Sequence, residues 1–391
     1  MNTATEFNPK RLTLARERRG LTKTKLAKAI GVDVRSVTAY ETDAFRPDKE
    51  RLAQLAQTLR FPIPFFFGDD LDQIAPDIVS FRSMSKMTAG QRDSALGAGA
   101  IALLLNEWIA ARFDLPAAAL PDLSQESSQA SLLQVGRTKP EVVHPEAAAD
   151  TLRRMWGLGE LPVKNMIHLL ESKGIRVFSL SIDTAQLDAF SMWHADTPFV
   201  FLNTMKSCEH SRFDAAHELG HLVLHRHAGS KGQEAEREAN AFASAFLMPR
   251  ASVLANAPHM ATVDQLIKFK AFWTVSVAAL AYRLHDVGLV SDWHYRNLCI
   301  EIAQRGYRKQ EPREAPREAS QVLAKVFAAL REDGTTKADI ASALSVHVEE
   351  IDQLVFGLAL TSMSSASPTA LSEARRPDLR VIQGGAEDPS R

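Results

Sequence analysis

Apolar residues recur at helical spacing along most of the chain. The pattern predicts helical segments at 12–19, 22–30, 34–40, 95–113, 163–170, 262–284 and 320–358. Two short apolar runs, 175–180 after a turn at Gly174 and 197–203, have the character of strands instead. We therefore expect a mainly α protein with an all-α N-terminal domain and a small α+β core in its middle part.

Breaks in this pattern divide the chain into five parts. They are 8–67, a helical linker region at 68–160, the α+β part at 161–310, a small helical domain at 318–360 and a disordered tail at 361–391. The Ser-, Pro- and Gln-rich stretch from Pro116 to Pro145 is expected to be a loop. A chain of 391 residues with 45% hydrophobic content can support two to three folded domains.

The first part has the pattern of a helix-turn-helix domain. Gly20 and Gly31 separate three short amphipathic runs, and Thr22 and Asp33 stand where helix N-caps are expected. Residues 1–60 carry thirteen Lys and Arg against seven Asp and Glu, although the formal net charge of the whole chain is −1. This local positive excess favours contact with DNA phosphates.

Within this pattern, the helix that begins at Asp33 or Val34 is the expected recognition helix. It is predicted to present four residues to the major groove of a double-stranded DNA operator, namely Val34, Arg35, Thr38 and Ala39, with Arg35 as the reader of guanine. Lys23, Arg46 and Lys49 are expected to contact phosphates. The alternative is a helical module that docks on another protein. We expect a homodimer if the operator is palindromic, because paired domains of this type read two half-sites.

The stretch His217-Glu218-Leu219-Gly220-His221 is an HExxH motif. Residues four apart on a helix lie one turn apart, so the imidazoles of His217 and His221 can converge on one zinc ion. Glu218 is the expected general base, which accepts a proton from a water that the ion activates. This is the chemistry of a metallopeptidase. The alternative is a chance occurrence of the motif on a surface helix.

A second helix, which contains 234–243, is expected to supply the third ligand. Glu236 is our choice, because Asn240 lies one turn later on the same face and can hydrogen-bond a ligand side chain. Glu234 is the weaker alternative, since no comparable polar partner follows it. Glu238 points elsewhere on the helix.

His225 continues the row of histidines, but it is not expected to bind the same metal. Eight residues of helix rise about 12 Å, which is too far for His217 and His225 to share one zinc ion at bond lengths near 2 Å. We expect His225 and His227 to be structural or surface residues, with a role beside the metal ligands or on the substrate side as the alternative.

Several stretches together carry a resemblance to a known family. They are the helix-turn-helix pattern, Phe81–Met84, the run from Arg212 to His221 and the run from Glu236 to Pro249. The chain resembles the ImmA/IrrE family of zinc metallopeptidases fused to an XRE-type DNA-binding domain, over most of residues 8–310.

The resemblance implies a zincin-like (gluzincin) peptidase core in which His217, His221 and Glu236 bind Zn²⁺ and Glu218 is the base. It also implies cleavage of a repressor-type protein, which relieves repression in stress or mobile-element induction. Many XRE-type domains carry Gln where this chain has Lys23, so the family's base preference does not carry over. Family members also differ in whether the regulator is fused or separate.

Two interpretations of the function follow. In the first, the protein is a zinc-dependent endopeptidase whose DNA-binding domain brings it to promoters or to its repressor target. In the second, it is a DNA-binding transcription regulator in which zinc is structural or sensory and proteolysis is absent. We expect a cytoplasmic protein without a membrane partner, because no apolar run reaches the ~18 residues of a span and no signal-peptide core is present. Cys208 and Cys299 lack CxxC spacing and indicate neither a disulfide scaffold nor a Cys zinc site.

Two segments leave alternatives open. The strand predicted at 197–203 is either a plain core strand or one that pairs with an extended peptide substrate. The segment 339–346 is typical of a second small helix-turn-helix, but few basic residues accompany it. Dimerisation or packing is therefore favoured over DNA contact there.

Overall fold

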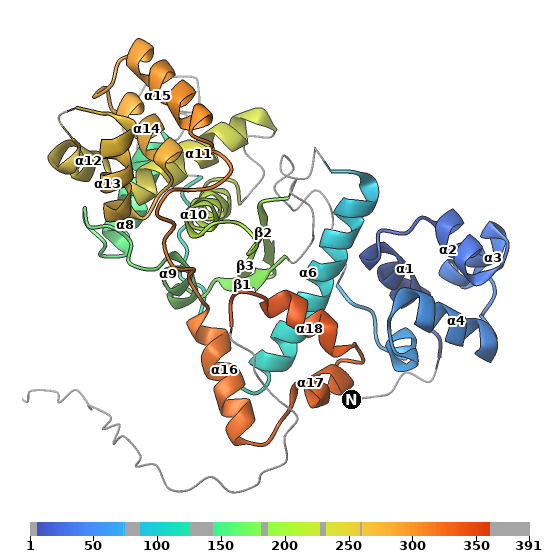
Figure 1. Cartoon of the computed structure of the whole chain (residues 1–391). Helices are drawn as coiled ribbons and strands as arrows, with labels where there is room; N and C mark the ends of the chain where they lie inside the picture. Colours follow the sequence, from blue (N-terminus) through green and yellow to red (C-terminus); the bar gives the residue numbers. More distant parts are fainter. Residues whose placement is uncertain are drawn as a thin grey trace, which may run out of the picture.

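The computed structural model of the protein describes residues 6–72, 74, 87–124, 144–180, 187–226, 232–258 and 260–359. Helices dominate this part of the chain and surround one small sheet (Figure 1). The predicted mainly α fold with a small α+β core is therefore confirmed. Phe81–Met84, His227, the tail 361–391 and most of the loop expected at 116–145 lie outside the described residues.

The N-terminal domain is formed by short helices with capped ends. It consists of α1 (Pro9–Arg18), α2 (Lys23–Ile30), α3 (Val34–Glu41), α4 (Lys49–Leu59) and the 3-10 turn η1 (Ile63–Phe67). The side chain of Thr22 accepts a hydrogen bond from the N–H of Lys25, and Asp33 accepts one from Arg35, so both predicted N-caps are present. α2 ends at Gly31, whose φ of 67° lies in the left-handed region that glycine adopts easily.

A three-stranded sheet lies at the centre of the larger part of the molecule. Its strands are β1 (Arg176–Ser179), β2 (Ala189–His194) and β3 (Thr197–Leu202). β3 is the middle strand, parallel to β1 and antiparallel to β2. The strand predicted at 197–203 is therefore present, but the alternative in which it pairs with a peptide substrate is wrong, because both of its edges are occupied. β2 has no counterpart among the elements predicted from the sequence.

Helices cover the two faces of the sheet. Ser191 of β2 faces α10 (Cys208–Leu224), whereas Phe190 faces α6 (Ala89–Ala110) near Gly99. α11 (Gln233–Leu247) packs on α10, and α8 (Pro145–Met155) packs on α11. The α10–α11 pair is thus held between the sheet and an outer helix (Figure 1).

The remaining helices extend this core. α9 (Met166–Ser172) precedes β1, and α12 (Arg250–Asn256), α13 (Val263–Trp273), α14 (Val277–Asp286) and α15 (Asp292–Gln304) gather beside α11. The chain then returns to the sheet with α16 (Gln321–Glu332), α17 (Lys337–Ala343) and α18 (Val348–Val355). α18 contacts β1 and α6, so this C-terminal unit packs on the protein, which is one of the two roles, dimerisation or packing, favoured from the sequence. No helix in the described ranges is long and apolar enough to cross a membrane.

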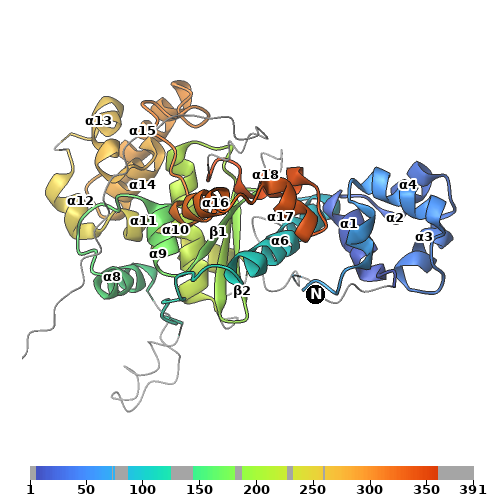
Figure 2. The ribbon, with the colours of Figure 1, turned by 90° about the horizontal axis from the view of Figure 1, so that it is seen from below.

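The N-terminal domain docks on the larger part through α1 (Figure 2). Gly20 and Gly90 let the two backbones come close, since a Cβ built on Gly20 would lie 2.9 Å from the carbonyl oxygen of Gly90. The buried carboxylate of Glu350 in α18 pairs with Arg18 at 2.9 Å and with Arg19 at 2.7 Å. Since Arg18 and Glu350 are both almost fully buried, their charges depend on each other.

Replacing Glu350 with Ala is expected to lower the free energy of unfolding by about 3 kcal/mol, because the buried guanidinium of Arg18 loses its counter-charge. Glu349→Ala removes the same charge from an exposed neighbouring position and is expected to change it by less than about 0.5 kcal/mol. Urea unfolding followed by circular dichroism measures both changes. Equal unfolding midpoints for the two variants would contradict the role of Glu350.

Candidate metal centre

α10 carries the HExxH stretch and is fixed on the sheet by its apolar side. Ser207 caps the helix by accepting a hydrogen bond from the backbone N–H of His210. Ala215, Leu219 and Val223 are fully buried. Trp193 of β2 donates its indole N–H to the carbonyl of Leu222 at 3.2 Å. With one side of α10 held in this way, the imidazoles of the motif face α11.

The three side chains predicted to bind zinc come together between α10 and α11. Nε2 of His217 lies 3.1 Å from Nε2 of His221. Glu236 places Oε2 at 3.4 Å from Nε2 of His217 and Oε1 at 3.5 Å from Nε2 of His221. One donor atom from each of the three lies within 4.8 Å of the other two. Two imidazoles and a carboxylate form a donor set of catalytic zinc, which keeps a fourth position open, so these residues fit the ion.

The alternatives considered from the sequence take other places. Glu234 is exposed in the first turn of α11. Glu238 contacts His225, where its Oε2 lies 2.8 Å from Nε2 of the imidazole. Neither belongs to the group of converging donor atoms that includes Glu236.

A glycine allows α11 to approach α10. A Cβ built on Gly220 would lie 3.0 Å from Cδ1 of Phe242 and 3.3 Å from Cα of Ala239. Such contacts are tighter than side chains normally make, and the second is to backbone, which cannot move alone. The glycine of the motif therefore sets the helix separation at which Glu236 reaches the two histidines.

Gly220→Ala is expected to destabilise the protein by about 1–3 kcal/mol through overpacking. An ordinary helix interior would instead gain roughly 0.5–1 kcal/mol from this change. We also expect weaker zinc binding, because α11 and Glu236 move away from α10. Thermal unfolding and a zinc titration measure the two effects. Adding Phe242→Leu, which replaces the ring that meets the new Cβ with a smaller side chain, should restore part of the stability. A Gly220→Ala protein as stable as the wild type would refute the close packing of the two helices.

Further side chains contact the candidate ligands and the expected base. Asn240, predicted to support a ligand, places its Oδ1 3.1 Å from Nδ1 of His217. Ser191 of β2 donates its hydroxyl to Oε2 of Glu218 at 2.6 Å. Nδ1 of His221 lies 2.9 Å from Nδ1 of His225. The contact of Ser191 was not predicted from the sequence, because β2 was not recognised. The contact of His225 with His221 could be anticipated, because His225 lies one helical turn after His221.

Negative charge surrounds the two candidate ligand histidines, His217 and His221. Burial disfavours ionised Glu236, but hydrogen bonds with His217 and His221 outweigh it and hold the pKa of Glu236 well below its usual range. Burial also disfavours a charged His217, yet the hydrogen bond to Glu236 and the nearby carboxylates raise its pKa. Burial raises the pKa of Asp214 to about 6. These carboxylates make the site attractive to a cation.

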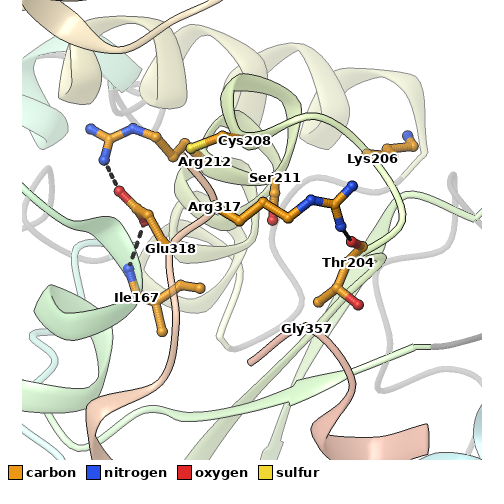
Figure 3. Close-up of a pocket in the computed structure, with 9 residues that line it drawn as sticks. All are labelled: Ile167, Thr204, Lys206, Cys208, Ser211, Arg212, Arg317, Glu318 and Gly357. Carbon is orange, nitrogen blue, oxygen red and sulfur yellow. Dashed lines mark hydrogen bonds and ion pairs between the residues drawn. The ribbon is translucent and has the colours of Figure 1, made fainter. Parts of the chain in front are cut away.

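A small cavity of about 20 Å³ lies at the start of α10, lined by none of the ligand candidates (Figure 3). Its charged residues fasten neighbouring segments: Arg317 donates to the carbonyl of Thr204, and Glu318 pairs with Arg212 and accepts from the N–H of Ile167. Burial raises the pKa of the Cys208 thiol to about 11, so the thiol is not a nucleophile at neutral pH. The cavity has room for about one water, and its charged residues hold neighbouring segments together, so its role is structural.

Another group of possible metal ligands consists of Asp72, Glu107 and His194. His194 pairs with Asp72 at 3.1 Å. Asp72 and Glu107 are exposed, where solvent satisfies carboxylates without an ion. This group gives no reason to assign a second metal.

The predicted DNA-binding residues fall into two sets. On α3, Val34, Arg35 and Thr38 are exposed and Ala39 is half-buried, so the expected reading surface is open to solvent.

Two of the three expected phosphate contacts are already engaged within the domain. Lys23 pairs with Glu41 at 3.2 Å, and Arg46 pairs with Glu6 at 3.2 Å. Lys49 is exposed at the start of α4.

Comparison with known families supports the two parts of the resemblance. Residues 170–285 match a peptidase-family model described as an IrrE N-terminal-like domain. Residues 12–66 match a family model of helix-turn-helix domains. A comparison with curated proteins gives no match. The chain thus combines an IrrE-like peptidase domain with an N-terminal helix-turn-helix domain for DNA binding.

Proposed function

We propose that the protein is a zinc-dependent endopeptidase and DNA-binding transcriptional regulator that cleaves a repressor-type protein. The observation that carries the peptidase proposal is the convergence of the donors of His217, His221 and Glu236. The carboxylate of Glu218 is hydrogen-bonded by Ser191 and is near enough to His217 to favour its charged form. The family match at 170–285, which includes the three donors, is consistent with it.

In this proposal His217, His221 and Glu236 hold the metal and Glu218 transfers protons. A zinc ion supplies Lewis acidity, which polarises a peptide carbonyl and activates water. Glu218 accepts the proton of the attacking water and returns it to the amine that leaves. Ser191 orients the carboxylate of Glu218 for both transfers. A zinc that served only structure would be held by a closed set of four protein ligands, whereas the group found among the described residues has three, the number that is typical of a catalytic zinc site.

The substrate class follows from the partnership of the two domains. A DNA-binding domain brings the peptidase domain to an operator, where a repressor is the protein that it meets. α3, with Arg35, lies on the side of the N-terminal domain away from the sheet and α10 (Figures 1 and 2). DNA can therefore bind while the domain remains docked. Relief of repression in a stress or mobile-element response, and a homodimer on a palindromic operator, complete the proposal.

Metal analysis separates this function from the alternative in which zinc is structural or sensory. We expect about one zinc per chain in the wild type and in Glu218→Gln, and loss of zinc in His217→Ala and Glu236→Ala, because only the ligands hold the ion. Cleavage of a peptide library, read by mass spectrometry, should occur with the wild type and fall by more than about 100-fold in Glu218→Gln. A wild-type protein that holds zinc but shows no more peptide cleavage than Glu218→Gln would favour the regulator alternative.

DNA binding has its own test. Arg35→Ala is expected to weaken binding to a duplex selected from a random library by about 1–3 kcal/mol and to relax the preference at one base pair. Lys49→Ala should weaken binding to all duplexes alike and lower the salt slope by about one. Electrophoretic mobility shifts at several salt concentrations distinguish the two. A wild-type protein that selects no duplex would indicate a protein-docking module, and unchanged binding in both variants would overturn the roles given to Arg35 and Lys49.

A further inference from the structure

His221 has a hydrogen-bonded partner on the side opposite its proposed metal-binding nitrogen. Its Nε2 faces His217 and Glu236, while its Nδ1 lies 2.9 Å from Nδ1 of His225. Nε2 of His225 in turn lies 2.8 Å from Oε2 of Glu238 on α11. The side chains of His221, His225 and Glu238 are 8%, 10% and 16% exposed, so water competes little for these contacts.

The direction of each hydrogen bond can be assigned by counting protons. A carboxylate only accepts, so Nε2 of His225 donates its proton to Glu238. A neutral His225 then has a lone pair on Nδ1, which accepts the N–H of His221 Nδ1. With its proton on Nδ1, His221 presents the lone pair of Nε2 toward His217 and Glu236. That tautomer is the one a metal requires.

We propose that His225 and Glu238 are positioning residues that lock His221 in its metal-binding tautomer. The inference rests on the proposed zinc site and adds to it what fixes the proton of one proposed ligand, His221, on Nδ1. It also explains why His225 supports the site without being a ligand, since its Nδ1 faces the back of His221 rather than the donor atoms.

The two proposed ligand histidines differ in what fixes their tautomer. The amide oxygen of Asn240 faces Nδ1 of His217 at 3.1 Å and is an acceptor in its own right. The acceptor for His221 is another imidazole, which can carry its proton on either nitrogen. Only the carboxylate of Glu238 makes the Nδ1 of His225 an acceptor. If His225 carried its proton on Nδ1, it would donate to His221 and place the proton of His221 on Nε2, where it blocks a metal.

The test measures Zn²⁺ affinity of the full chain at pH 7 by competition with a chromophoric chelator. His225→Phe keeps a ring but removes the acceptor, and we expect about 10–100-fold weaker binding. His225→Asn places an amide oxygen where Nδ1 of the imidazole was, and should retain most of the affinity. Glu234→Gln removes an exposed carboxylate from the same helix as Glu238 and serves as the charge-matched control, with less than about a twofold change.

Glu238→Gln supplies the sharper comparison. In the wild-type background the amide can donate to Nε2 of His225 and release the wrong tautomer, so zinc binding should weaken several-fold more than in Glu234→Gln. In the His225→Asn background the acceptor no longer depends on position 238, and Glu238→Gln should have no added effect. A merely structural or electrostatic role of Glu238 would give the same loss in both backgrounds.

The outcomes separate this inference from the proposed function. Wild-type affinity in both His225→Phe and Glu238→Gln would overturn the tautomer lock while leaving the zinc site intact. Equal losses in His225→Phe and His225→Asn would overturn the acceptor role. A wild-type protein that binds no Zn²⁺ would overturn the metal centre itself. The melting temperatures of the metal-free variants identify a fold defect, and should His225→Phe prove misfolded, the two-background comparison of Glu238→Gln decides.

Discussion

The close contact between α10 and α11 at Gly220 is the constraint on which the candidate site depends. A single methyl group at this position would lie against the ring of Phe242 and the backbone of Ala239. Because Gly220 contributes no side chain to this contact, Glu236 reaches His217 and His221, Asn240 reaches the back of His217, and Glu238 reaches His225. One small residue thus places four pairs of polar side chains at hydrogen-bond or near-ligand distance. The helix that carries the motif also supplies the space for its partner.

The parts of this site that lie on one helix could be predicted, because helix geometry is local. The spacing of His217 and His221 determines that their imidazoles lie on one face. The pairing of Glu236 with Asn240, one turn apart, also pointed to the residue that the structure brings to the histidines. The caps at Thr22 and Asp33 are equally local, since a side chain there satisfies an N–H two or three residues on.

Features that depend on long-range packing could not be predicted in the same way. β2 has four successive buried residues, Ala189 to Met192, so no alternation of polar and apolar positions marks it as a strand. Ser191 becomes a partner of Glu218 only because the sheet order places β2 beside α10. Lys23 has the charge of a phosphate contact, yet the fold brings it to Glu41. In each case the decisive neighbour is distant in sequence, and its position is a property of the whole fold.

The contact of Arg18 and Arg19 with Glu350 gives the two domains more than a covalent link. α18 in turn touches β1, and Thr204, just after β3, donates its hydroxyl to the carbonyl of Phe356. The DNA-binding domain is therefore joined to the sheet that supports α10 by direct contacts, so the position of the candidate metal site relative to α3 is set by packing. In the proposed function, a repressor on the same DNA would meet that site at a raised effective concentration. A substrate chosen in this way would need little sequence specificity at the cleaved bond, because location on the operator would supply the selection.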